Sequence, residues 1–185
     1  MVNKIFPEDD NKMNDIILVT YASRTGGTRG VAEAIGKTLA EGGAQVEVLS
    51  MEAVKDLTPY AAVVAGSAIR DKKWLPEAMQ FIQTNRAALN HKPIAVFLVC
   101  MTLAMTNAEK YRPFVADFMQ PVRALVKPVS EGLFAGILDI SKVESLKDRL
   151  MFKMSVKLGT WSEGDHRDWQ AIQAWAKALG PILTR

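Results

Sequence analysis

Hydroxyl and glycine residues gather in one short stretch near the start of the chain. The stretch reads Ser23, Arg24, Thr25, Gly26, Gly27 and Thr28. Serine and threonine hydroxyls donate hydrogen bonds to phosphate oxygens, and glycine lets a backbone approach a ligand closely. We therefore expect this stretch to hold a phosphate group.

The kind of phosphate is narrowed by what the stretch lacks. A nucleoside triphosphate loop has a lysine after its second glycine, but here Thr28 follows Gly27. A dinucleotide loop needs the spacing G-x-G-x-x-G, which Gly26, Gly27 and Gly30 do not provide. A monophosphate held by neutral donors remains, and an ordinary strand-to-helix turn with capping hydroxyls is the alternative.

The segments on either side of the stretch predict a strand and a helix. An apolar run at 16–20 precedes it, and an apolar face with helical spacing occupies 28–41. A strand followed by a loop and a helix points backbone N–H groups and the positive end of the helix dipole at one place. The predicted arrangement therefore suits an anion.

The remaining elements predict an α/β protein. Further strands are expected at 45–50, 61–67, 94–101 and 129–134, and helices at 52–57, 75–88, 108–125 and 166–179. Pro113 and Pro121 should kink or split the third of these helices, and Ser162 and Asp165 are candidate caps for the last. The strands are continuous apolar runs, which indicates a parallel sheet covered on both faces.

Composition limits the class of protein. The chain has 185 residues, of which 49% are hydrophobic, so we expect one domain at 15–185 behind a flexible extension at 1–14. Its single cysteine, Cys100, excludes a disulfide within the chain and should be a buried core thiol. The two histidines, His91 and His166, have no second ligand at metal spacing, so no metal site is expected.

The charge points to an anionic partner. The formal net charge is +3 and the isoelectric point is near 9.0. This favours an acidic protein or an anionic membrane surface. No nucleic acid is expected, because zinc-finger, basic-heptad and RNP-like patterns are missing. The sequence shows neither a membrane span nor a signal pattern, so we expect a cytoplasmic protein, with peripheral contact at the inner face of the membrane as a further expectation.

The stretch 23–28 resembles the FMN phosphate loop of flavodoxins, whose pattern is Ser/Thr-x-Thr-Gly-x-Thr. Segments 66–70, 74–76, 134–136 and 168–169 resemble menaquinone-dependent protoporphyrinogen oxidases within that group. The resemblance implies a flavodoxin-like three-layer α/β/α sandwich with five parallel strands in the order 2-1-3-4-5. It also implies FMN as the cofactor.

The function implied by this resemblance is electron transfer. One candidate is an oxidoreductase that passes electrons to a quinone, with protoporphyrinogen as a candidate donor. The other is a non-enzymatic flavodoxin-type carrier that docks on redox partner proteins. The basic charge favours the first, because soluble flavodoxins that shuttle electrons are typically acidic. No catalytic residue is predicted.

Two further loops should line the flavin ring. They contribute Ser67, Ala68, Ile69, Arg70, Met101, Thr102, Leu103 and Ala104. A guanidinium near the ring would stabilise the reduced, anionic flavin, so Arg70 should raise its potential. The alternative is an exposed Arg70 paired with Asp71.

The segment 142–158 is additional to a minimal fold of this type. Its residues Val143, Leu146, Leu150, Met154 and Leu158 form an apolar stripe at helical spacing. Five basic side chains accompany two acidic ones, Glu144 and Asp148. The stripe either packs on the sheet and leaves a solvated basic face, or the helix lies on an anionic membrane or caps a quinone site.

Overall fold

The computed structural model describes residues 16–143 and 145–184. The expected extension at 1–14, and Glu144, lie outside the described residues.

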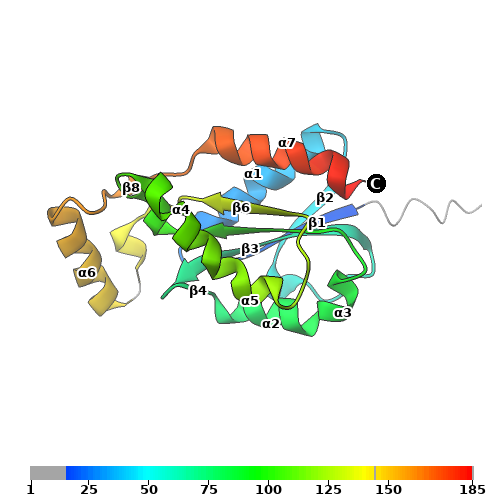
Figure 1. Ribbon diagram of the computed structural model, residues 1–185, viewed down its shortest axis with the longest axis horizontal. Helices are drawn as coiled ribbons and strands as arrows, with labels where there is room; N and C mark the ends of the chain where they lie inside the picture. Colours follow the sequence, from blue (N-terminus) through cyan, green and yellow to red (C-terminus); the bar gives the residue numbers. More distant parts are fainter. Residues whose placement is uncertain (1–15, 144, 185) are drawn as a thin grey trace, which may run out of the picture.

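A parallel sheet forms the middle layer (Figure 1). Its order is β2-β1-β3-β5-β6, and the short β4 pairs antiparallel with the end of β3. The strands are β1 (Ile16–Ala22), β2 (Gln45–Ser50), β3 (Tyr60–Arg70), β4 (Lys73–Trp74), β5 (Ile94–Val99) and β6 (Ser130–Phe134). With β4 set aside, this is the predicted order 2-1-3-4-5, and the flavodoxin-like fold class is confirmed.

Two apolar clusters fill the space between the sheet and its helices. On one face lie α1 (Gly27–Glu41) and α7 (Trp169–Leu183), and on the other α2 (Pro76–Thr84), α3 (Arg86–Leu89), α4 (Ala108–Ala116) and α5 (Gln120–Arg123). Short 3-10 turns complete the connections: η1 (Met51–Ala53), η2 (Met101–Ala104), η3 (Asp117–Met119) and η4 (Ile140–Lys142). The central strands are buried because helices cover both of their faces.

The helix expected at 108–125 is split, as the prolines predicted. The break falls at η3, between the prolines, since Pro113 lies inside α4 and Pro121 is in the first turn of α5. The helix expected at 75–88 is also divided, at Asn85.

The third strand runs past its predicted end at Ser67. Pairing of Ile69 with Trp74 and of Arg70 with Lys73 extends β3 into a tight hairpin. Asp71 and Lys72 make its turn with φ values of 49° and 63°. The hairpin carries Arg70 beyond the edge of the parallel sheet.

The predicted caps of the last helix are wrong. The helix begins at Trp169, and the carboxylate of Asp168 accepts a hydrogen bond of 2.9 Å from the backbone N–H of Ala171. Ser162 and Asp165 lie several residues earlier, and Asp165 belongs to a strand. The helix starts later than predicted because the segment before it is extended. Residues of β8 (Gly164–Asp165) pair with β7 (Ile137–Leu138) in a two-stranded ribbon.

The segment 142–158 contains α6 (Leu146–Lys157), which stands at one end of the sandwich (Figure 1, gold). Leu146, Leu150, Met154 and Leu158 of its apolar stripe are 79%, 62%, 58% and 77% exposed. The interpretation that this stripe packs on the sheet is therefore wrong, because α6 turns it toward solvent. Among residues 16–143 and 145–184, no helix is long and apolar enough to cross a membrane.

Candidate functional site

The hydroxyl and glycine stretch forms the turn between β1 and α1. Gly26 has a φ of 84°, a backbone conformation that favours glycine, and its N–H donates to the hydroxyl of Ser23 at 3.1 Å. The helix starts at the next residue, Gly27, so the unpaired N–H groups of its first turn face the loop. This arrangement can hold an anion through backbone donors.

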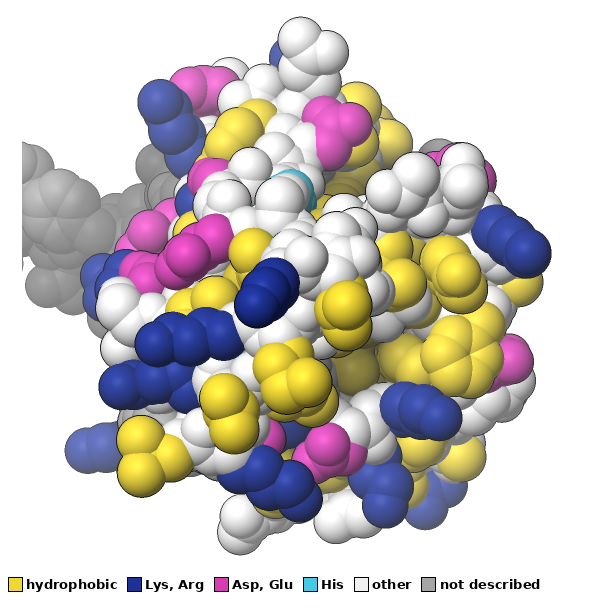
Figure 2. All heavy atoms as spheres, turned by 90° about the vertical axis from the view of Figure 1, so that its left-hand side faces the viewer, with side chains coloured by type: hydrophobic (Ala, Val, Ile, Leu, Met, Phe, Trp, Pro, Cys, Tyr) yellow, Lys and Arg dark blue, Asp and Glu magenta, His cyan; other side chains and the backbone are white. Residues whose placement is uncertain are grey.

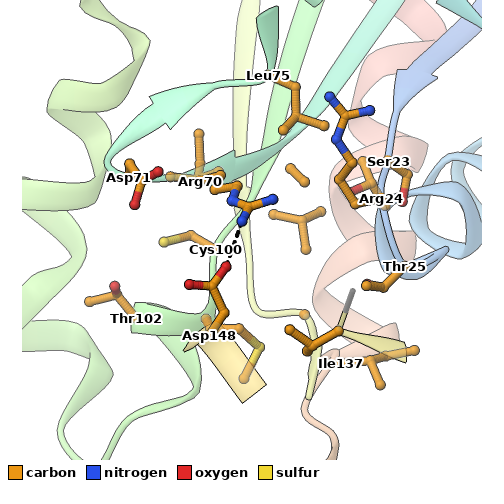
Figure 3. A pocket seen from close by; sticks show the side chains of 18 of the residues that line it. Ser23, Arg24, Thr25, Arg70, Asp71, Leu75, Cys100, Thr102, Ile137 and Asp148 are labelled. Atoms are coloured by element: carbon orange, nitrogen blue, oxygen red, sulfur yellow. Dashed lines mark hydrogen bonds and ion pairs between the residues drawn. The ribbon is translucent and has the colours of Figure 1, made fainter. Parts of the chain in front are cut away.

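Arg24 does not place its charge in the middle of the loop. Its guanidinium forms two contacts of 2.9 Å with the carboxylate of Glu77 on α2, and Figure 3 shows it at the rim of the cavity. Glu77 neutralises this charge and attaches the loop to α2. The donors that the loop offers are therefore backbone N–H groups and hydroxyls.

A cavity of about 360 Å³ opens beside this loop at the carboxyl ends of the strands. Ten of the predicted site residues line it: Ser23, Arg24, Thr25, Gly27, Thr28, Ala68, Ile69, Arg70, Met101 and Thr102. In open α/β sheets ligands bind outside the carboxyl ends of the strands, where the strand order reverses. The cavity lies at that edge.

Four predicted residues are not among those that line this cavity. Gly26 shapes the loop itself. Ser67 is buried, and its hydroxyl donates to the carbonyl of Ala68 at 2.8 Å and accepts from the N–H of Leu75 at 3.0 Å. Leu103 packs in the core, and Ala104 borders a neighbouring hollow.

Arg70 is paired, but with a different residue from the one proposed. Its Nη2 lies 2.5 Å from Oδ2 of Asp148 on α6, as Figure 3 shows. Asp71 points away from this pair in the same view. The sequence suggested only the adjacent Asp71 as a partner for Arg70, because Asp148 on α6 is distant in the chain.

The far wall of the cavity consists of residues that were not among the predicted site residues, although part of it belongs to the segment 142–158. This wall includes Phe114, Phe118, Gly136, Ile137, Ser145, Asp148, Met151, Phe152 and Trp161. Cys100, predicted only as a buried core thiol, is buried and also lines the cavity. The apolar stripe of α6 did indicate a helix that could cap a quinone site, although nothing local tells which of its faces meets the cavity.

Trp161 adds an unsatisfied donor to this wall. Its indole Nε1 is buried and has no hydrogen-bond partner in the described part of the chain, and its ring packs 5.4 Å from that of Phe152. A buried donor without a partner costs free energy, which a ligand acceptor would recover. An anion loop, an apolar wall and a free donor together fit a planar ring that carries a monophosphate.

An ion pair between Asp165 and Arg167 lies behind the loop. The Arg167 guanidinium donates two hydrogen bonds to Asp165, and this holds the pKa of that carboxyl below its ordinary value. Within the described ranges, no group of three or more His, Cys, Asp or Glu side chains could hold a metal ion.

Comparison with known proteins agrees with this geometry. The flavodoxin domain family matches residues 18–166, which is more than half of the chain, so the protein belongs to the flavodoxin domain family. Protoporphyrinogen IX dehydrogenase [quinone] of Escherichia coli (strain K12) is 24% identical over 177 residues, covering 91% of this chain and 96% of that protein.

Solved structures share the fold. Oxidised Flavodoxin 2 from Bacillus cereus superposes with a TM-score of 0.57 at 22% identity, covering 91% of this chain and 99% of that one. A flavodoxin from the domain Archaea gives 0.56 at 20% identity, covering 92% and 99%. The chain is thus a flavodoxin-type redox protein, and its fold implies a flavin cofactor.

Proposed function

We propose that this protein binds FMN and passes electrons from an organic donor to a quinone, with protoporphyrinogen as the candidate donor. The observation that carries the proposal is one cavity that joins a neutral phosphate loop to an apolar space at the switch point of the sheet. The name of the Escherichia coli relative supports the quinone and the porphyrinogen.

The phosphate would be held by the loop 23–28. Backbone N–H groups and the hydroxyls of Thr25 and Thr28 are the donors, and Ser23 retains a hydroxyl proton to donate. The ring would lie between 68–70 and 101–102. When bound, FMN supplies the redox chemistry, and the surrounding residues orient the ring and exclude water.

A quinone would meet the ring on the side of α6. Phe114 is 46% exposed and Met151 is 47% exposed, and both line the cavity. Figure 2 shows apolar side chains around a hollow on this face, with lysines and arginines at its margin. An apolar entrance suits a lipophilic acceptor.

We also propose that α6 contacts an anionic membrane that contains this acceptor. The exposed residues of α6 are Leu146, Lys147, Leu150, Met151, Lys153, Met154 and Lys157. Asp148, its one acidic residue, is turned inward to Arg70. An exposed helix face that combines leucines and lysines, without acids, is typical of a helix in the membrane interface.

The test is reconstitution with FMN followed by reduction and reoxidation. We expect one FMN per chain, and rapid reoxidation by a soluble menaquinone analogue after reduction by a porphyrinogen. A reduced flavin that the quinone leaves unoxidised, while a redox protein oxidises it, would contradict the enzyme and favour the alternative.

The alternative is a non-enzymatic flavodoxin-type carrier. The face in Figure 2 would then dock on redox partner proteins, and its lysines would favour acidic ones. The flavodoxin structural neighbours favour this candidate. Redox potentiometry separates the two, since a carrier should have a very low midpoint potential and the quinone enzyme a higher one.

A further inference from the structure

We propose that Arg167 is a positioning residue for the phosphate loop, acting through the first turn of α1. Loss of its side chain should weaken the binding of a flavin that carries a phosphate and leave a flavin without one unaffected. The inference rests on the proposed FMN site and adds a residue that is distant from it in sequence.

The guanidinium of Arg167 crosses the first turn of α1. Its Nη1 lies 3.4 Å from the carbonyl oxygen of Gly27, to which it donates. A Cβ atom added at Gly30 would collide with the same nitrogen, so the close approach depends on a glycine there. The side chain is only 11% exposed, which is rare for an arginine unless it is paired.

Three contacts fix the orientation of this guanidinium. Nε and Nη2 donate to the two carboxylate oxygens of Asp165 at 2.8 and 2.7 Å, and the ring of Trp169 stacks at 4.2 Å. These contacts leave Nη1 to face Gly27. A bidentate, stacked arrangement of this kind requires the planar fork of arginine.

The partners of Arg167 belong to the elements behind the loop. Asp165 lies in β8, which pairs with β7, and the backbone nitrogen of Ile137 in β7 comes within 3.7 Å of a Cβ built at Gly27. The ribbon and Arg167 thus support the start of α1 on one side, while Arg24 and Glu77 support the loop on the other.

This support is local to the phosphate end of the helix. Val31, Ile35 and Leu39 hold the rest of α1 in the core, and all three are at most 3% exposed. Since Asp165 neutralises the guanidinium, Arg167 adds little net charge to the site. Its effect should come from keeping the N–H groups of the first turn directed at the phosphate.

The experiment compares FMN with riboflavin, which has the same ring and no phosphate. Quenching of flavin fluorescence by the apoprotein gives both affinities. For Arg167→Ala we expect FMN affinity to fall at least tenfold and riboflavin affinity to change less than twofold. Equal losses for both flavins, or an unchanged FMN affinity, would overturn the proposal.

Arg167→Lys separates position from charge. Lysine keeps the charge but lacks the fork, so we expect a loss of FMN affinity close to that of the alanine variant. Full recovery of FMN affinity by lysine would show that charge alone matters, and this also overturns the proposal.

Gly30→Ala tests the same contact without removing Arg167. Alanine favours a helix more than glycine does, so a weakened α1 cannot explain a loss of FMN affinity. We expect the added methyl group to displace the guanidinium and to lower FMN affinity selectively, and an unchanged ratio of FMN to riboflavin affinity would contradict the proposal. This variant decides the question if Arg167→Ala does not fold.

The matched control is Arg29→Ala. Arg29 lies on the same turn of α1 but is 63% exposed and pairs with Glu33. Its loss should leave both affinities unchanged, and a selective FMN loss here would favour general electrostatics instead. If the unmodified protein binds no FMN, the proposed function itself fails, whereas normal FMN binding that is insensitive to Arg167 refutes only this inference.

Discussion

The two ends of the candidate flavin cavity are held in place very differently. At the phosphate end, Gly27 and Thr28 are buried, and ion pairs attach the loop to α2 and support the start of α1 from β8. At the other end, α6 has no buried residue. Its link to the body of the sandwich includes one ion pair, between Asp148 and Arg70.

This difference in support suggests that the two ends of the cavity have different functions. A phosphate site gains affinity when its donors are held in advance, because little ordering remains to be done on binding. A segment with few buried contacts opens at low free-energy cost. We infer that the phosphate end anchors the cofactor, whereas the α6 end can adjust to whatever approaches the ring.

The largest expected effect tests the α6 end. Replacing Lys147, Lys153 and Lys157 with glutamine should weaken attachment to anionic vesicles by about 3 kcal/mol at low salt, since each lysine near such a surface contributes about 1 kcal/mol. Vesicle co-sedimentation measures this. The control replaces three exposed lysines elsewhere, Lys37, Lys55 and Lys177. No binding of the unmodified protein at low salt would refute the membrane proposal.

The next effect tests the phosphate end. Replacing Thr25 and Thr28 together with alanine should weaken FMN binding by about 1–3 kcal/mol, because phosphate oxygens lose their hydroxyl donors. Flavin fluorescence titration gives the affinity, and Thr184→Ala, just after the end of α7, serves as the control. An unchanged affinity would argue that the loop does not contact the phosphate.

A smaller effect concerns the ion pair that links α6 to the end of β3. Arg70→Ala should lower the midpoint potential of the bound flavin and Asp148→Asn should raise it, since the two charges act oppositely on a reduced, anionic ring. A partly exposed charge interaction is worth about 1 kcal/mol, which corresponds to a shift of roughly 20 mV in the midpoint potential of a two-electron couple. Potentiometry with Arg112→Ala as control decides, and shifts of the same sign in both variants would contradict the assignment.

The smallest effect concerns the support behind the phosphate loop. The folded pKa of Asp165 lies below 3.8, so its contribution to stability is present above that pH and is lost as the pH falls through the lower, folded value. Asp165→Asn should therefore be slightly less stable near neutral pH, and the difference should shrink in acid. Urea unfolding at several pH values tests this, and a difference independent of pH would exclude the carboxylate as its cause.

Much of the fold, and the elements that form one half of the candidate site, could be predicted from the sequence. The phosphate loop and both of its flanking elements are contiguous, from β1 to α1, so local patterns suffice. The ring side was predicted less well. Ser67 and Leu103 were expected to line the ring, but Ser67 lies within β3 and bonds to neighbouring backbone groups, and Leu103 packs in the core.

The last helix shows how neighbouring structure shifts a local prediction. Helical spacing places Trp169, Ile172, Ala176 and Leu179 on one face of this helix, and the last three of these residues are buried. Trp169, placed on the same face, is 38% exposed and stacks on Arg167. Helical spacing does not reveal that the chain enters the helix from a ribbon, where Asp168 becomes the cap.

The sequence by itself determined the succession of the main strands and helices along the chain, the hydroxyl and glycine turn between β1 and α1, and the apolar stripe of α6, because each depends on residues close together in the chain. Only the tertiary structure decided that the stripe of α6 faces outward, that Arg70 meets Asp148, 78 residues away, and that Arg167 reaches Gly27 across 140 residues. Periodicity shows that a helix has two faces, but which face is buried depends on packing against segments that are distant in sequence.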